Sequence, residues 1–317
     1  MTIEIVPYSE DLAPAWDEFC SPAMNATFLH TRRFLAYHGN RFEDVSLIMM
    51  EAGSIVGVMP AAFVGENRHV VVSHPGLTYG GVVHQGRLSG TRMIDAIGAV
   101  RTYYAAQGCT KLIYKAVPYI YSDMPAQGDL YALFRYGALR TRCDLACTID
   151  LNHRLPMSER RRRGLKKATE VVTLADDPAN LQELWTVLEQ NLARKHAAQP
   201  VHSLVELKSL LNLFPKEIQI RCARINGCVE AGAVFFNSRG AWHAQYIASS
   251  ERGYQVSALD AVFDSAIREA AEAGVRYFDF GTSNEEGGAV LNDGLYRFKQ
   301  EFGGGGVAHE FYELDLA

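Results

Sequence analysis

The sequence has no long apolar run. None of its segments approaches the 18 or more consecutive apolar residues that cross a bilayer. The N-terminal residues MTIEIVPYSEDLAP also lack the basic and then apolar order of a secretory signal. We therefore expect a soluble, cytoplasmic protein without a membrane span.

Cysteine is sparse, and its spacing excludes the common cysteine motifs. The six cysteines form no CxxC pair and lie mostly in apolar, strand-like segments. They are Cys20, Cys109, Cys143, Cys147, Cys222 and Cys228. Buried, reduced thiols are the usual state of such residues. We therefore expect neither a disulfide framework nor a bound metal.

An excess of basic residues is absent as well. The formal net charge is -5, which argues against a protein whose whole surface binds nucleic acid but leaves a local basic patch open. The chain has 317 residues, of which 48% are hydrophobic. That length is sufficient for two domains that each bury a core.

What the sequence does contain is a repeated order of elements. A hairpin is predicted at Gly53 and another at Asn226-Gly227, because glycine supplies the positive φ that tight turns need. Each hairpin is followed by an apolar strand, an amphipathic helix that stops near a glycine, and a short strand. The helices carry Met93, Ile97, Val100 and Tyr104 in the first copy and Val256, Leu259, Phe263, Ile267 and Ala270 in the second.

The repeat predicts two similar domains in tandem, although α+β proteins also repeat such an order of strands and helices by chance. Each domain is expected to be a mixed α/β, or α+β, layer in which helices flank a mostly antiparallel sheet. The boundary is placed at about Asp150, giving domains over residues 1–150 and 151–317, with the last strand able to pack on the first domain. Because no low-complexity linker separates them, we expect a cleft between the two.

Three segments resemble a known family. FDFGTS followed by LYRFKQEFGG resembles the C-terminal pattern of the FemAB-like (Fem-type) aminoacyl and acyl transferases, which are built from two GNAT-like domains. The segment Pro75–Gly81 and the basic stretch SERRRRGLKKA are further points of similarity. Two departures stand out: SSERGYQVSA lacks the intact CoA-binding pattern, and no long coiled-coil insertion is present.

The resemblance implies transfer of an acyl or aminoacyl group to an amine, from acyl-CoA or aminoacyl-tRNA as co-substrate. It implies that Phe298 and Lys299 lie where donor and acceptor meet, with Lys299 stabilising the negative charge that develops there. Without the resemblance, Lys299 would be interpreted as an exposed helix residue and Phe298 as a core residue.

Asp279 is the third candidate catalytic residue. It alternates with Phe278 and Phe280 near the end of an apolar strand, where a carboxylate acts either as a proton acceptor or as an acceptor for backbone donors of the next loop. We favour the structural role. Glu230 and His243 are weaker candidates for a base.

The donor is expected at the loop before the second amphipathic helix, as in GNAT domains. Arg252, Gly253 and Tyr254 are the candidate residues there, together with Tyr246 on the preceding strand.

The basic stretch after Ser158, a candidate helix N-cap, suits a phosphate-bearing ligand through Arg160, Arg163 and Lys167. A solvated helix face is an equally good interpretation.

The glycines Gly303–Gly306 are expected to end the preceding helix and turn the chain into the strand VAHEFYEL. Four glycines are more than a helix cap needs. Glycine also lets a backbone approach a ligand closely.

These observations predict an N-acyltransferase with no tightly bound cofactor and no metal. Residues 1–150 are expected on the acceptor side and residues 151–317 on the donor side. Acyl-CoA is slightly favoured over aminoacyl-tRNA, because an acidic chain offers little surface for tRNA. The acceptor is an amine-bearing small molecule or a cell-envelope precursor, and the protein a monomer or weak dimer. The alternative is a non-catalytic binding or scaffold protein of the same fold.

Overall fold

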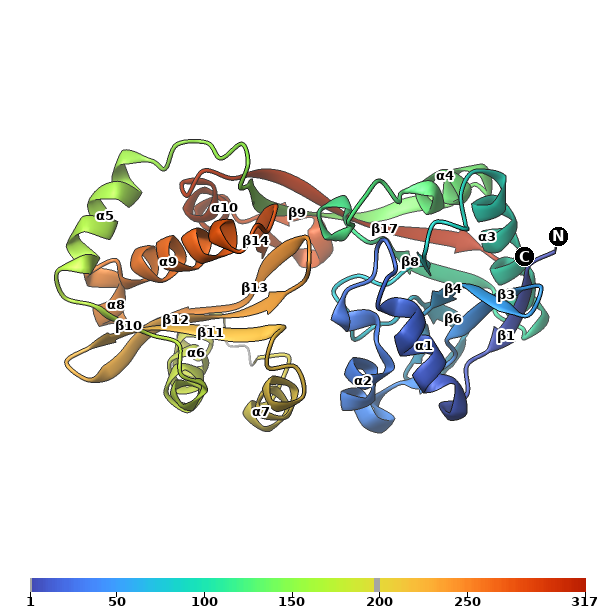
Figure 1. Ribbon diagram of the computed structural model, residues 1–317, viewed down its shortest axis with the longest axis horizontal. Coiled ribbons are helices and arrows are strands. Elements are labelled where there is room, and N and C mark those ends of the chain that lie inside the picture. Colours follow the sequence, from blue (N-terminus) through green and yellow to red (C-terminus); the bar gives the residue numbers. More distant parts are fainter. Residues whose placement is uncertain (1, 197–199) are drawn as a thin grey trace. The chain divides into compact units, whose positions relative to one another are not determined.

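The computed structural model describes residues 2–196 and 200–317 (Figure 1). The chain divides into two compact units. The first unit comprises Met1–Asp144, Asn284–Val290 and Ala308–Ala317, and the second comprises Leu145–Ser283 and Leu291–Val307. Neither unit is one continuous segment, since the end of the last strand belongs to the first unit.

The first unit is a mixed layer of strands and helices. Its sheets run in the orders β1-β3-β4-β7 and β17-β8-β6-β5-β2. The strands are β1 (Glu4–Pro7), β2 (Glu43–Asp44), β3 (Leu47–Glu51), β4 (Ser54–Met59), β5 (Ala62–Val64), β6 (Asn67–Val72), β7 (Val83–His84) and β8 (Lys111–Lys115). The helices are α1 (Ala13–Cys20), α2 (Arg32–Leu35), α3 (Thr91–Ala106) and α4 (Gly128–Arg135).

Strands β9 (Leu139–Asp150) and β17 (Gly305–Asp315) carry residues of both units. Two short strands, β15 (Asn284–Glu285) and β16 (Val290–Leu291), pair with each other and follow β14 (Tyr277–Thr282) in the chain.

Two apolar layers hold the first unit together. On one face of its strands, Met93, Ile97 and Val100 of α3 are fully buried against residues such as Leu47 and Leu112. A second cluster packs α1, through Trp16, against Ile48, Val58 and Val83. Because side chains alternate along a strand, β3 can supply both layers.

The second unit has the strand order β10-β11-β12-β13-β14-β9. The strands are β10 (Thr173–Ala175), β11 (Ile218–Ile225), β12 (Cys228–Asn237), β13 (Ala241–Ser249) and β14 (Tyr277–Thr282). The helices are α5 (Glu159–Thr169), α6 (Leu181–His196), α7 (Leu204–Leu213), α8 (Glu251–Gln255), α9 (Ala258–Glu272) and α10 (Asp293–Gln300).

Helices cover both faces of this sheet: α9 lies on one face, and α6 and α7 lie on the other (Figure 1). On the α9 face, Phe263 meets the rings of Phe235, Phe278, Phe280 and Phe302 at centroid distances of 4.8 to 6.4 Å. Such edge and tilted contacts stabilise a core beyond the area they bury. The predicted fold class, helices flanking mixed and mostly antiparallel sheets, is confirmed.

The glycine run after α10 is explained by close backbone approach. The helix ends at Gln300, and Gly303 adopts a φ of 100°. A Cβ at Gly303 would lie 2.1 Å from the Leu155 carbonyl oxygen, and one at Gly304 would lie 3.0 Å from that of Thr148. These two glycines are required by packing, whereas Gly305 and Gly306 already belong to β17.

Candidate active site of the second unit

A fork in the sheet of the second unit defines the site. Strands β13 and β14 are parallel and pair over only three positions, the last of which joins His243 to Asp279. Strand β13 continues to Ser249 and β14 to Thr282 beyond this point. A register shift between β12 and β13 at Val234/Phe235 marks a bulge in β13 next to the fork.

The carboxylate of Asp279 lies at the fork and is fully buried. Its Oδ1 accepts hydrogen bonds from Thr148 Oγ1 at 2.8 Å and from the Gly281 amide at 3.1 Å. Its Oδ2 lies 2.7 Å from His243 Nδ1. Asp279 therefore binds the backbone two residues further along β14, and it also binds one of the two weaker base candidates, His243.

Lys299 is buried and not an exposed helix residue. Only 3% of it is accessible, and its Nζ donates hydrogen bonds to the carbonyl oxygens of Gly281 at 3.0 Å and Thr282 at 2.6 Å. Burial lowers the pKa of Lys299 from 10.5 to about 8, against the opposing attraction of Asp279 and Cys147. The ammonium group therefore lies at the end of β14, where Asp279 also binds the Gly281 amide.

Phe298 is half-buried and packs against the aromatic core of the second unit. Its ring contacts Phe263 and Phe302 at centroid distances of 6.2 and 5.5 Å. The guanidinium of Arg161 lies 4.9 Å from its centroid, within cation–π range.

Arg161 is the residue of the basic stretch that sequence reasoning failed to single out. Its Nη1 donates to Asp260 Oδ1 at 2.5 Å and its Nε to Glu301 Oε2 at 2.9 Å, so it joins α5 to α9 and to the end of α10. Burial raises the pKa of Asp260 to about 6, against the attraction of Arg161. The sequence does contain one signal for Arg161, which is its spacing. Ser158 caps α5, and Arg161 shares one face of this helix with the small residues Gly164 and Ala168.

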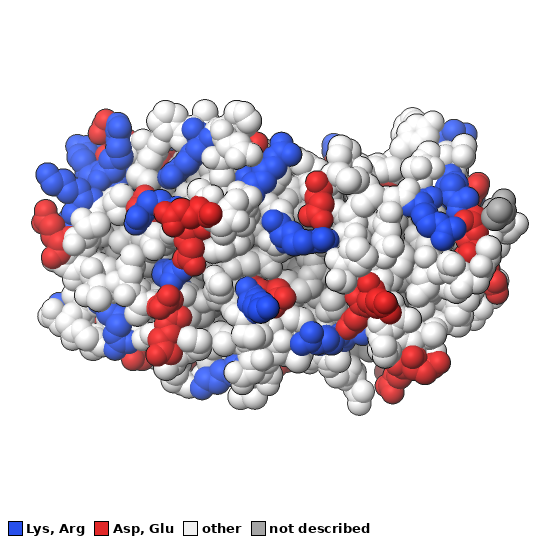
Figure 2. All heavy atoms as spheres, in the orientation of Figure 1, with Lys and Arg blue, Asp and Glu red and all other residues white. Residues whose placement is uncertain are grey.

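The other basic residues of α5 are exposed. Arg160 lies 3.8 Å from Glu301, and Lys167 donates to the Gln255 carbonyl oxygen at 2.7 Å. Arg163 is also exposed. Figure 2 shows Lys and Arg side chains gathered over the part of the second unit where α5 lies. A phosphate-binding role for Arg160, Arg163 and Lys167 stays a prediction.

The predicted donor loop forms α8 and is tightly packed. A Cβ at Gly253 would lie 2.5 Å from the Glu230 carbonyl oxygen, and the Gly253 amide donates to Ser250 Oγ at 3.0 Å. Packing against β12 therefore accounts for glycine at 253. Arg252 lies 4.0 Å from the Glu230 carboxylate, and Tyr254 is exposed.

Tyr246 lies in a different environment from these α8 residues. Its ring packs edge-on against Trp185 of α6, and its hydroxyl lies 2.5 Å from His202 Nδ1. Burial raises the pKa of Tyr246 to about 12. A donor-binding role for Tyr246 stays a prediction, and the structure gives it a packing role.

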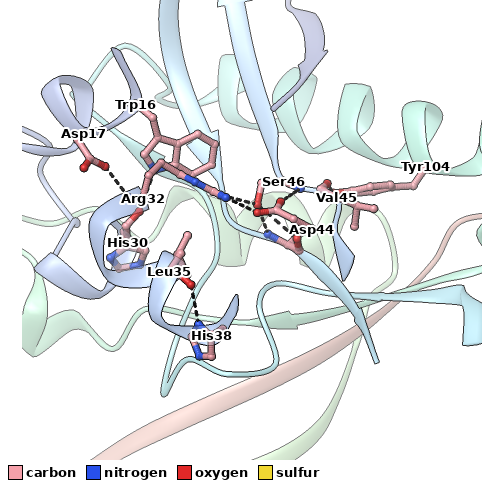
Figure 3. Close-up of polar contacts among 11 residues, drawn as sticks. Trp16, Asp17, His30, Arg32, Leu35, His38, Asp44, Val45, Ser46 and Tyr104 are labelled. Carbon is pink, nitrogen blue, oxygen red and sulfur yellow. Dashed lines mark hydrogen bonds and ion pairs between the residues drawn. The ribbon is translucent and has the colours of Figure 1, made fainter. Parts of the chain in front are cut away.

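A groove of about 1020 Å³ lies within the first unit, and no pattern in the sequence predicts it. Figure 3 shows Arg32 between α1 and β2, where its guanidinium pairs with Asp44 and donates to Ser46 Oγ. The Arg32 amide donates to Asp17 Oδ1, and His38 Nδ1 donates to the Leu35 carbonyl oxygen at 3.0 Å. The lining residues come from α1, α2 and the loops at residues 8–10, 38–44 and 74, so no single sequence segment carries the groove.

Comparison with known proteins identifies the class. Residues 154–300 match the family model described as an acetyltransferase (GNAT) domain. No curated protein matches the chain in sequence. The matched residues contain β10 to β14 and α5 to α10, including the fork and Lys299, whereas β9 and β17 lie outside them. These residues form a GNAT acyltransferase domain, which confirms the prediction of an acyltransferase.

Solved structures extend the likeness to the whole chain. The chain is similar to FemX, with a TM-score of 0.69 at 11% identity over 98% of this chain and 97% of that one. It is similar to L-PGS from Bacillus licheniformis, with a TM-score of 0.62 at 13% identity over 97% and 92%. A tandem GNAT protein from the clavulanic acid biosynthesis pathway follows, with a TM-score of 0.55 at 12% identity over 99% of each. The predicted resemblance to Fem-type, tandem GNAT-fold proteins is therefore confirmed at the level of the fold.

Among residues 2–196 and 200–317, no helix combines the length and the apolar content that crossing a bilayer requires.

Proposed function

We propose that the protein is an N-acyltransferase that moves an acyl or aminoacyl group from an activated donor to an amine, with acyl-CoA as the favoured donor. The observation that supports this most is the fork, where β13 and β14 separate directly after a buried Asp279–His243 pair. Because β14 stops pairing with β13 at this point, we expect the backbone groups of β13 beyond the fork to pair with an extended, amide-containing donor.

Lys299 supplies the positive charge that this reaction needs. Acyl transfer passes through a tetrahedral adduct whose oxygen carries a negative charge, and fixed donors aimed at that oxygen are usually the largest catalytic contribution. A Lys ammonium has three N–H donors, and the carbonyls of Gly281 and Thr282 occupy two. Its burial strengthens the interaction with a developing charge, because little water competes.

Residues 151–317 are proposed to bind the donor and residues 1–150 the acceptor. The groove of about 1020 Å³ in the first unit has the size of a small-molecule site and combines aromatic, His, Arg and carboxylate side chains. An amine-bearing small molecule or a cell-envelope precursor fits that mixture of groups. FemX and L-PGS share the fold, which favours acceptors of this kind and keeps aminoacyl-tRNA as the rival donor.

A thermal-shift screen tests the donor. Short and long acyl-CoA thioesters, charged tRNA, uncharged tRNA and free CoA are each added to the full chain. The proposal predicts stabilisation by at least one acyl-CoA, by about 2.7 kcal/mol when its concentration is 100 times Kd. Stabilisation by charged tRNA and by no thioester moves the assignment to the rival donor. No shift with any donor contradicts the proposal.

A further inference from the structure

The imidazole of His243 is fixed in one tautomer. Asp279 Oδ1 accepts from two donors, Thr148 Oγ1 and the Gly281 amide, and the Lys299 ammonium attracts the carboxylate, so we assign Asp279 as ionised. Because an ionised carboxylate only accepts, the 2.7 Å contact at Oδ2 requires the proton on His243 Nδ1. The lone pair of neutral His243 is therefore on Nε2.

The fold keeps this pair aligned. Asp279 is completely buried, and its two other donors come from β9 and from the backbone of β14 itself. Gly281, with a φ of 72°, brings the end of β14 close to the ring: a Cβ there would lie 3.0 Å from His243 Cε1. A side chain at this position would displace the imidazole.

The histidine itself is reachable from solvent, unlike its partner. About 13% of the His243 side chain is accessible, whereas the Asp279 side chain is at 0%. The ring lies at the last paired position before β13 and β14 separate. A buried carboxylate that orients a partly exposed imidazole is the arrangement that general bases use in acyl transfer.

Other titratable groups surround the pair on each neighbouring element. Lys299 of α10 and Cys147 of β9 act electrostatically on one another, and Lys299 is attracted by Asp279. On β12, the cross-strand partner of His243 is Phe236, whose ring contacts His202 before α7. Tyr246, further along β13, pairs with that same His202. The proton of Nδ1 is thus committed to Asp279, and Lys299 adds positive charge near the carboxylate.

We propose that His243 is the proton acceptor of this site, with Asp279 and Thr148 as its positioning residues; the inference rests on the proposed function. The amine nitrogen bonds to the donor carbonyl carbon, and the carbonyl electrons move to oxygen. Nε2 takes the proton that the nitrogen loses. The bond to sulfur, or to the ribose oxygen of an aminoacyl-tRNA, then breaks with its electron pair, and His243 returns the proton to that leaving group. The products are an amide and a free thiol or hydroxyl.

The kinetic test compares full-chain wild type with His243→Asn, using a donor and amine that the wild type converts. The expected loss in kcat/KM is about 10²- to 10⁴-fold, the usual contribution of a general base. The acid limb of the pH–rate profile disappears in the variant. Added imidazole restores part of the rate to His243→Ala. His69→Asn removes an exposed imidazole of the first unit and keeps the wild-type rate and profile.

The positioning residues have their own readout. Thr148→Val removes one donor to Asp279 without changing the side-chain volume greatly, and it is expected to lower kcat while KM for the donor stays unchanged. The acid limb shifts with it, which a variant that only destabilises the fold would not produce.

A second measurement separates this inference from the proposed function. Diethyl pyrocarbonate modifies neutral, accessible imidazole nitrogens, and mass spectrometry locates the product. His243 is expected to react in the folded wild type and to react more slowly in Asp279→Asn, or in Thr148→Val if the first variant does not fold. An unreactive His243 overturns the inference, as does a His243→Asn variant with the wild-type rate and pH profile. If no donor and amine give an amide, the proposed function fails, and the modification result alone decides whether His243 is the basic group of the site.

Discussion

At the scale of single residues, Lys299 is placed where its charge is unfavourable for stability. Burial lowers its pKa from 10.5 to about 8, a difference equivalent to roughly 3 kcal/mol. Lys115 of the first unit is in the same state: its Nζ lies among the carbonyls of His74, Pro75 and Leu77, and burial lowers its pKa to about 8. Two buried ammonium groups that bind backbone carbonyls thus occur, one in each unit.

The pKa of Lys299 gives opposite pH trends for stability and activity. Between pH 8 and 10.5 the unfolded chain binds more protons than the folded one at this residue, so the free energy of unfolding rises with pH across that window. Activity falls over the same range, because the ammonium loses the proton that stabilises the oxyanion. Chemical denaturation at several pH values measures the first trend and initial rates the second.

Lys299→Met is the control for this prediction. The variant loses the contribution of Lys299 to the pH slope of stability and keeps that of Lys115, so the slope is reduced and not abolished. An unchanged slope in Lys299→Met, or wild-type activity that is constant from pH 7 to 10, contradicts the account.

At the scale of elements, Arg161 connects three helices around the site. It pairs with Asp260 of α9 and Glu301 after α10, and its guanidinium packs on Phe298. Arg161→Met leaves the buried Asp260 without its partner, and removal of one member of a buried pair costs about 3–5 kcal/mol. Urea unfolding measures the loss.

Arg268 offers the matched control, because it forms an Arg–Asp pair with Asp264 on the exposed side of α9. Arg268→Met is expected to cost less than about 1 kcal/mol, as exposed pairs do. Equal losses for the two variants would show that Arg161 does not hold α10.

Local sequence patterns predicted helices, strands and turns better than they predicted contacts between distant residues. The turn at Asn226-Gly227 does join β11 to β12, and the expected helix that stops at Gly274 is α9. The turn chemistry and the helical period are properties of neighbouring residues, so a single sequence contains them. The Asp279–His243 contact joins residues 36 positions apart through parallel strand pairing, and no local pattern specifies that register.

The candidate site was predicted unevenly for the same reason. Phe298 and Lys299 were identified through a family resemblance, and in the structure Lys299 donates to the last two carbonyls of β14. Arg161 stood within a run of four arginines, where only the packing of α5 on α9 distinguishes the buried one from its exposed neighbours. Gly253 was expected to bind a ligand, but its contact with β12 depends on tertiary structure.

At the scale of the whole molecule, the two compact units do not correspond to two continuous halves of the sequence. The predicted boundary at Asp150 lies at the end of β9, which contributes to both units, and residues 308–317 return to the first unit. There β17 pairs with β8, and Leu314 and Leu316 are buried in the first unit's core. A repeat predicts how many domains a chain forms, whereas strand pairing decides which segments complete each one.

The central claim is that the second unit transfers an acyl group to an amine beside Lys299. Its most direct test uses mass spectrometry to measure the rate of amide formation by wild type and by Lys299→Met. The donor is the one selected by the thermal-shift screen. The account predicts that both proteins bind the donor with similar affinity, and that the variant forms amide about 10²- to 10³-fold more slowly. Amide formation by Lys299→Met at the wild-type rate would contradict it.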